Sequence, residues 1–214
     1  MAAPVDEHAV LDGAGGKIIA DAAIVEMSEH GYHGTSVRDI AERAGMSSAA
    51  LYHHFSSKQD LLFHITDRGI ADLVRATEAA LEASPDDPAA RLRAIVRVHV
   101  LRHTEHRQGS FIGNSEIRSL EPENRAIVVS KRDQQARLFD RVVADGLERG
   151  VFTTLYPKDA SRAIITMCTA VAQWYRPDGP LGPDEIAERY ADLSLAMLGH
   201  REQAPGSSVA DGGK

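Results

Sequence analysis

One stretch of the chain, residues 34–58 (GTSVRDIAERAGMSSAALYHHFSSK), gathers hydroxyl, imidazole and cationic side chains at helical spacing. Its second half would present four residues outward: Ser48, Ala49, Tyr52 and His53. The small residues at the start of that face allow close approach to base edges, and the tyrosine and histidine can form hydrogen bonds farther along. A helix N-terminus with hydroxyl donors also suits phosphate oxygens. We therefore predict that this face enters the major groove of a DNA duplex.

Two short helices joined by a tight turn at about a right angle are needed to hold that face. Such a turn requires a small residue where the helices cross, which is Ala41, and a glycine four residues later, Gly45, where a positive φ carries no Cβ penalty. Met46 would pin the turn. Ser47 is placed to cap the second helix and is also a candidate for a DNA contact. The inner faces are apolar at Val37, Ile40, Leu51 and Phe55. This pattern predicts a helix-turn-helix; the alternative is a packing corner without function.

Four more residues around this motif are candidates for DNA contacts. Thr35 and Ser36 are expected to cap the first helix and to donate to a phosphate, and Arg38 is the candidate for reaching a guanine. Lys58 is expected to offer a free cation to the DNA backbone. Residues 31–68 nevertheless carry no net charge, since four acidic side chains offset the four basic ones. Binding should therefore depend on helix dipoles, hydroxyl groups and the avidity of a dimer.

Composition excludes several other classes of protein. The chain has 214 residues, 24 Lys+Arg against 31 Asp+Glu, and a formal net charge of −7. Its one cysteine cannot form an intrachain disulfide, and it nearly excludes a cysteine-based zinc site. The longest charge-free stretch has 13 residues (163–175), short of the ~20 that span a bilayer. The first residues lack the pattern of a signal peptide. We expect a cytoplasmic protein without a membrane partner.

Hydrophobic spacing predicts an all-α fold of about nine helices, among them one from Ser47 to Phe55 and a short one near 110–119. Proline is absent from residues 5–84, and the later prolines fall between apolar-periodic stretches, where they separate helices. The expected organisation has four parts: a mobile N-terminus (1–13), a three-helix helix-turn-helix domain (14–56), a larger helical domain (57–200) and a mobile tail (201–214).

The run from Gly31 to Leu62 resembles the DNA-binding domain of the tetracycline-repressor (TetR/AcrR) family of bacterial one-component regulators. The matching features are Gly31, Thr35, Ile40-Ala41, Ala44-Gly45, Leu51-Tyr52, Phe55, Lys58 and Leu61-Leu62. The resemblance implies a homodimeric regulator with an N-terminal DNA reader and a C-terminal domain for ligand binding and dimerisation. It also implies DNA contacts at Thr35, Ser36, Arg38, Ser48, Ala49, Tyr52, His53 and Lys58. Ala50 departs from the family pattern, which often has a hydroxyl there.

A second copy of the chain is the expected partner, because one recognition helix touches only a few base pairs. Two half-sites of a palindromic operator should lie roughly 34–36 Å apart. The last two helices, expected at 159–175 and 183–199, are apolar on more than one face and could form a four-helix seam. The predicted interface residues are Ile164, Cys168, Val171, Ile186, Tyr190, Leu193 and Met197. The alternative is that they are buried within one chain.

A looser resemblance concerns the effector. The segments EIRSL (116–120), 130–152 and WYRPDGPL (174–181) resemble regulators beside genes for fatty-acid, acyl-CoA or sterol breakdown. A small apolar molecule, an acyl-CoA or a fatty acid, is therefore the predicted effector. The predicted pocket residues are Phe111, Ile112, Phe139, Met167 and Trp174; for each of them the alternative is ordinary core, which is the commoner role of such a residue. Arg102, Arg118 and Arg176 are candidates to meet an anionic head group.

Three histidines at helical spacing, His99, His103 and His106, could offer a zinc pair. Because the one carboxylate nearby, Glu105, is expected to point elsewhere, we predict no metal. No cofactor is predicted either. The leading hypothesis is a repressor that a ligand releases from its operator. The alternatives are a DNA-binding regulator without ligand control and an all-α enzyme. Against the enzyme, the sequence holds no nucleophile elbow, phosphate-binding glycine loop or HExxH motif, so no catalytic residue is predicted.

Overall fold

The computed structural model describes residues 13–200, and within them the chain is all helical. It has nine α-helices and one 3₁₀ turn, and no strand occurs in this range, which confirms the predicted all-α fold. In chain order they are α2 (Ala14–Gly34), α3 (Val37–Arg43), α4 (Ser48–Tyr52), α5 (Lys58–Ala83), α6 (Pro88–Glu105), α7 (Arg107–Ser115), η1 (Glu116–Ser119), α8 (Pro122–Glu148), α9 (Pro157–Trp174) and α10 (Pro183–Met197). The predictions of mobile ends at 1–13 and 201–214 lie almost entirely outside the described residues.

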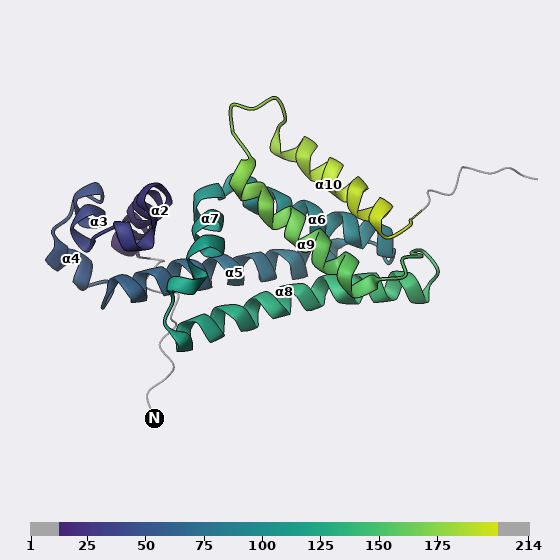
Figure 1. Ribbon diagram of the computed structural model, residues 1–214, viewed down its shortest axis with the longest axis horizontal. Helices are drawn as coiled ribbons and strands as arrows, with labels where there is room; N and C mark the ends of the chain where they lie inside the picture. Colours follow the sequence, from purple (N-terminus) through teal and green to yellow (C-terminus); the bar gives the residue numbers. More distant parts are fainter. Residues whose placement is uncertain (1–12, 201–214) are drawn as a thin grey trace, which may run out of the picture.

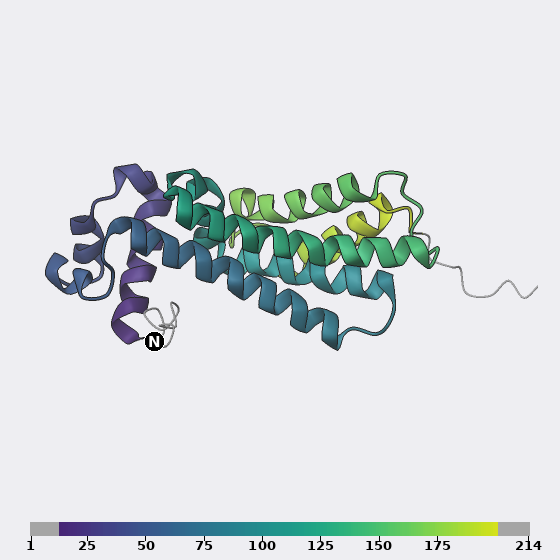
Figure 2. The same ribbon diagram turned by 90° about the horizontal axis from the view of Figure 1, so that it is seen from below.

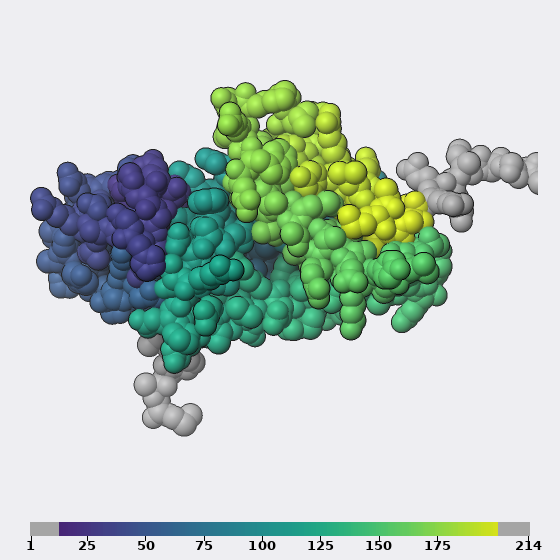
Figure 3. Space-filling view, viewed as in Figure 1, coloured from purple at the N-terminus to yellow at the C-terminus, as the bar shows by residue number. Residues whose placement is uncertain are grey.

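The molecule is elongated, with the three N-terminal helices at one end (Figure 1). Helices α5 and α8 run side by side along its length, as both ribbon views show (Figure 2). Helix α6 packs on α5, α9 and, most extensively, α10. Helices α9 and α10 therefore lie on the surface of the larger part, away from α3 and α4 (Figure 3). Among residues 13–200 no helix is both long and apolar enough to cross a membrane.

Local sequence explains where the helices begin. Ser36 caps α3 in a reciprocal box, since its hydroxyl accepts from the Asp39 N–H (3.2 Å) and its own N–H donates to the Asp39 carboxylate (2.8 Å). Ser57 caps α5 in the usual way, accepting from the Asp60 N–H (3.0 Å). Proline stands at the first turn of α6, α8, α9 and α10, where its missing N–H costs nothing.

Two helices end earlier than their sequence pattern predicts. Helix α4 stops at Tyr52 rather than reaching Phe55, because the chain turns at the two histidines that follow. The helix expected at 110–119 is instead α7 followed by the separate 3₁₀ turn η1. Element boundaries are the part of a helix that periodicity defines least well.

The core consists of two clusters. The first holds the inner faces of α2, α3 and α4 together with the start of α5, Ile112 of α7 and Val128 of α8. The second fills the space between α6, α8, α9 and α10, around Phe139 and Phe152. The first part of α5 belongs to the N-terminal cluster, so this helix continues from the helix-turn-helix into the larger part of the molecule.

Gln59, near the start of α5, joins the two parts through all of its side-chain polar atoms. Its amide nitrogen donates to the Tyr32 hydroxyl (2.9 Å) and to the Ser119 carbonyl (2.5 Å). Its oxygen accepts from the backbone N–H of Glu121 (3.1 Å). This side chain therefore ties α2 to the junction between η1 and α8.

Replacing Gln59 by alanine is expected to lower the free energy of unfolding by about 1–3 kcal/mol, because the partners of this amide are left without a hydrogen bond. Urea unfolding measures the change. Gln134→Ala is the matched control, since it removes only an exposed bond to Glu78 (3.1 Å) and should stay within about 0.5 kcal/mol of the wild type. Equal losses in the two variants would contradict the role given to Gln59.

Candidate DNA-binding surface and ligand cavity

The turn between α3 and α4 has the geometry that its sequence predicts. Gly45 has φ of 66°, a left-handed conformation that favours glycine. The Gly45 N–H donates to the Glu42 carbonyl (3.1 Å) and the Met46 N–H to the Ala41 carbonyl (2.9 Å), which closes the end of α3. Ala41 is buried where the helices cross, and Met46 packs against the first core cluster. The structure thus contains a helix-turn-helix.

The inner and outer faces of this motif are separated as expected. Ile40, Leu51 and Phe55 are fully buried, whereas Tyr52 keeps 53% of its surface exposed. Four other predicted contact residues differ in exposure: Ala49, His53 and Ser47 are exposed, and Ser48 is half-buried. The Ser47 hydroxyl accepts from the Ala50 N–H (3.1 Å), so this residue caps α4 as predicted. The outward face of α4 is free to approach a duplex.

Thr35 is wrongly placed by the sequence interpretation. It is only 2% exposed, and its hydroxyl donates to the Gly31 carbonyl (2.8 Å) at the end of α2 rather than capping α3. Ser36 alone is the cap of α3, and it remains exposed. Thr35 therefore holds the turn that leads into the motif and does not present its hydroxyl to solvent.

Lys58 is not the free cation that the sequence suggests. Its ammonium donates to the carbonyls of Tyr32 (2.8 Å) and Thr35 (2.6 Å) and lies 4.2 Å from the centre of the Tyr32 ring. Burial lowers the pKa of this amine below its usual value. Lys58 anchors the chain between α2 and α3, because carbonyls left open at a helix end need donors. The spacing of residues along the sequence does not predict these two hydrogen bonds.

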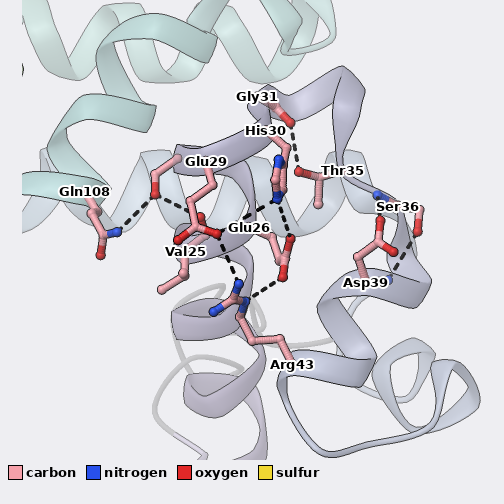
Figure 4. A network of polar contacts seen from close by, with 11 residues as sticks. Val25, Glu26, Glu29, His30, Gly31, Thr35, Ser36, Asp39, Arg43 and Gln108 are labelled. Atoms are coloured by element: carbon pink, nitrogen blue, oxygen red, sulfur yellow. Dashed lines mark hydrogen bonds and ion pairs between the residues drawn. The ribbon is translucent and has the colours of Figure 1, made fainter.

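Arg38 and Arg43 lie on the same short helix but have different surroundings. Arg38 is exposed and forms no ion pair with residues 13–200, so it remains the cationic candidate for a DNA contact. Arg43 instead pairs with Glu26 (2.5 Å) and Glu29 (3.1 Å) of α2, as Figure 4 shows. The hydrogen bond to Glu26 raises the pKa of Arg43. This network fixes α3 against α2.

A cavity of about 1020 Å³ lies between α2 and the helices α5 to α9. Its apolar lining includes Ile24 of α2, Ile65 and Leu73 of α5, Val128 of α8 and Ile165 of α9. The volume is at the upper end of the range for small-molecule sites. Because α2 contributes to the wall, an occupant would touch the N-terminal helices and the larger part of the protein at once.

Arginine side chains supply charge at the cavity wall. Arg102 lies 3.6 Å from the carboxylate of Asp72, and Arg132 donates to the Gly113 carbonyl (2.6 Å) and to Asn114 Oδ1 (3.1 Å). Burial lowers the pKa of both guanidinium groups, although they stay charged. Arg102 is one of the three arginines predicted to meet an anion. The other two, Arg118 and Arg176, are exposed and do not line the cavity.

The same wall holds two stacked histidines of α6. The rings of His99 and His103 are nearly parallel, with centroids 4.6 Å apart. Burial lowers the pKa of His103 to about 4 and that of His99 well below its usual value, so both rings are neutral at physiological pH. His106 is exposed, and among residues 13–200 no group of three side chains could hold a metal ion.

None of the five predicted pocket residues lines this cavity. Ile112 is buried in the first core cluster and Phe139 in the second. Phe111 and Met167 are half-buried elsewhere, and Trp174 is an exposed side chain near Tyr190 (centroids 6.3 Å apart). Apolar periodicity identified buried faces, but which of them border a cavity depends on how six helices meet. The cavity is also lined by the polar residues Arg132, Asn114 and Thr169, and no pattern in the sequence identified them as ligand-binding candidates.

Four of the predicted dimer contacts are buried within one chain, so their side chains are not on its surface: Ile164, Cys168, Val171 and Ile186. Burial raises the pKa of the Cys168 thiol to about 12, as expected for an inert core residue. The other three lie on the surface of α10, where Leu193 is 55% exposed, Met197 is exposed and Tyr190 is half-buried. Together with Trp174 of α9 they form an apolar surface, called here the α9–α10 face.

A helix-turn-helix with an exposed second helix, continuous with a larger helical part that encloses a cavity, defines a one-component DNA-binding regulator. Residues 19–65 match the family described as bacterial regulatory proteins, tetR family. Residues 85–198 match the tetracyclin repressor-like C-terminal domain. The chain belongs to the TetR family of transcriptional regulators, which confirms the resemblance seen in its sequence.

Relatives of known name or structure match nearly the whole chain. The HTH-type transcriptional repressor KstR2 of Mycobacterium tuberculosis is 30% identical, over 84% of this chain and 90% of that protein. A tetR-family regulatory protein from Rhodococcus RHA1 has a similar structure, with a TM-score of 0.83 and 31% identity over 89% of this chain and 100% of that one. The structure of AibR in complex with isovaleryl coenzyme A and operator DNA has a TM-score of 0.74 and 26% identity, covering 85% of this chain and 96% of that one.

Proposed function

We propose that this regulator is a homodimeric repressor which a small amphipathic ligand of the acyl-CoA type releases from a palindromic operator. The observation that carries the proposal is the cavity, whose wall combines α2 of the DNA reader with apolar side chains and the cationic groups of Arg102 and Arg132. Residues 14–56 would serve as the DNA-binding domain and residues 57–200 as the ligand-binding and dimerisation domain. The protein would act in the cytoplasm and without catalytic activity.

The DNA contacts are assigned to the outward side chains of the motif. Arg38, Ala49, Tyr52 and His53 are exposed, and the N-cap at Ser47 leaves the first N–H groups of α4 near the surface. Ser36 and Ser48 add hydroxyl groups at the two helix starts. Two copies are needed, because this short face covers few base pairs, and the α9–α10 face offers the apolar surface for pairing.

Release would follow from the position of the cavity. Gln108 of α7 donates to the Ser28 hydroxyl of α2 (3.1 Å; Figure 4), and Gln108 also lines the cavity. Lys17 and Ile24 of α2 lie in the same wall. A ligand that fits only when α2 and α7 move apart would bind that conformation more tightly and so would increase its population. Because α2 belongs to the DNA-binding domain, this movement would change the distance between the two DNA-binding domains of the dimer.

Two measurements on the purified protein test this function. Gel shifts with DNA from the region upstream of its own gene should show a complex that acyl-CoA thioesters dissociate. Thermal unfolding should show a rise in the melting temperature with the same thioesters. A complex that no acyl-CoA or fatty acid dissociates, together with an unchanged melting temperature, would favour a regulator without ligand control. Failure to bind any DNA upstream of its gene or elsewhere in the genome would overturn the proposal.

A further inference from the structure

The inner wall of the cavity carries three polar side chains whose hydrogen-bonding roles can be worked out. They are His99 and His103 of α6 and Thr169 of α9, and all three line the cavity. The two imidazoles are only 2% and 5% exposed. Buried polar atoms normally have partners, so an atom without one points to a missing group. The inference rests on the proposed ligand release and concerns the chemistry of the ligand.

His103 presents a hydrogen-bond acceptor. Its Nδ1 lies 2.8 Å from the His99 carbonyl, and because a carbonyl only accepts, Nδ1 carries the proton. The ring is neutral, since burial holds its pKa at about 4. Nε2 therefore has a free lone pair, and it forms no hydrogen bond with the part of the chain that the structure describes.

Thr169 presents a hydrogen-bond donor. His99 Nε2 lies 3.0 Å from the Thr169 hydroxyl oxygen, while His99 Nδ1 is buried without a partner in residues 13–200. An unpaired buried N–H is rarer than an unpaired lone pair, so the proton belongs on Nε2, which donates to the hydroxyl oxygen. The hydroxyl proton of Thr169 is then left to donate elsewhere.

We propose that the ligand carries a hydroxyl group on its apolar portion, which donates to His103 Nε2 and accepts from the Thr169 hydroxyl. One hydroxyl group satisfies both, because it is a donor and an acceptor at the same time. A saturated hydrocarbon chain in this place would leave both protein atoms buried and unpaired, which disfavours its binding. The anionic end of the ligand would meet Arg102 or Arg132, and Arg107, which forms no ion pair within the described residues, also lines the cavity.

The test compares saturated acyl-CoA thioesters with hydroxylated ones of the same chain length, the position of the hydroxyl being varied along the chain. Calorimetric titration of the wild-type protein should show at least one hydroxylated isomer binding roughly tenfold more tightly than its saturated counterpart. In His103→Phe and Thr169→Val this ratio should approach one, while the saturated thioester still binds. Thr166→Val is the matched control, because its exposed hydroxyl bonds only to the Arg162 carbonyl (2.7 Å) on the same helix.

The outcomes separate this inference from the function on which it rests. Equal binding of saturated and hydroxylated thioesters by the wild type would overturn the hydroxyl assignment and leave an acyl-CoA effector standing. A preference that persists in both variants would also overturn it. If no thioester of either kind binds, the acyl-CoA effector itself is wrong, and the inference fails with it. The comparison of saturated with hydroxylated thioesters in the wild-type protein tests the hydroxyl assignment even if a variant does not fold.

Discussion

Replacing Tyr52 by alanine is expected to weaken operator binding by about 1–3 kcal/mol, roughly five- to 150-fold. The side chain projects from the end of α4 with half of its surface exposed, and it does not belong to the first core cluster. The change should leave the melting temperature almost unaltered, because exposed substitutions usually alter stability little. Fluorescence anisotropy with labelled operator DNA measures the affinity.

The matched control for this experiment is Tyr156→Ala. Tyr156 is likewise exposed (69%), but it lies at the start of α9, at the end of the molecule opposite to α4 (Figure 1). Its loss should leave the affinity for DNA unchanged. If both variants bind the operator as well as the wild type, the outward face of α4 is not the surface that reads DNA.

The second large effect is on stability in acid. In the unfolded chain His103 takes up a proton near pH 6.5, whereas in the folded protein it stays neutral until about pH 4. The unfolded state therefore binds more protons between these values, so the folded state is favoured above pH 6.5 and loses stability as the pH falls. For this residue the loss amounts to about 3 kcal/mol by pH 4.

His103→Gln removes that proton uptake, so its unfolding free energy should decline less steeply between pH 6.5 and 4 than that of the wild type. Urea unfolding at a series of pH values measures the slope. Burial lowers the pKa of His99 in the same way, so the variant should keep part of the acid sensitivity of the wild type. The exposed residue His53 provides the control for the substitution itself, since replacing an exposed side chain by glutamine should alter the unfolding free energy little. Parallel curves for wild type and His103→Gln would show that His103 is not buried in neutral form.

The helix-turn-helix could be predicted because its determinants are local. The turn and the helix caps depend on residues a few positions apart, namely Ala41, Gly45 and Ser47 together with the inner apolar residues. Their spacing in the sequence is therefore enough to predict the geometry of the motif. The same locality predicted the exposure of Tyr52 and His53. A resemblance to a known family added the larger helical part, which local patterns alone describe only as a succession of helices.

The differences between the sequence predictions and the structure have a common physical cause. Periodicity shows that Cys168 and Ile186 lie on an apolar face, but it does not show whether the neighbour of that face is another helix of the same chain or a second copy. The cavity depends on six helices meeting, so its lining mixes residues that are far apart in sequence, such as Ile24 and Thr169. Lys58 reaches carbonyls more than twenty positions away, which no local pattern encodes.

The two assigned surfaces also explain how the protein could combine its tasks. Helix α2 packs on α3 through Arg43 and on α7 through Gln108, and it contributes to the cavity wall. A small displacement of α7 by a ligand would therefore reach α3 through direct contacts. Gln59→Ala removes the hydrogen bonds that connect α2 to the junction between η1 and α8. This variant should therefore show a weaker response of DNA binding to ligand as well as a lower stability.

Sequencing of the DNA fragments that the protein selects from a random pool is the most direct test of the whole account. Two copies of the exposed α4 face should enrich an inverted repeat whose half-sites are centred about one helical turn apart, or a small multiple of it. Adding the acyl-CoA thioester that binds best should abolish the enrichment. A pool without any enriched motif, or with a single unrepeated one that the ligand does not affect, would contradict a paired reader under ligand control.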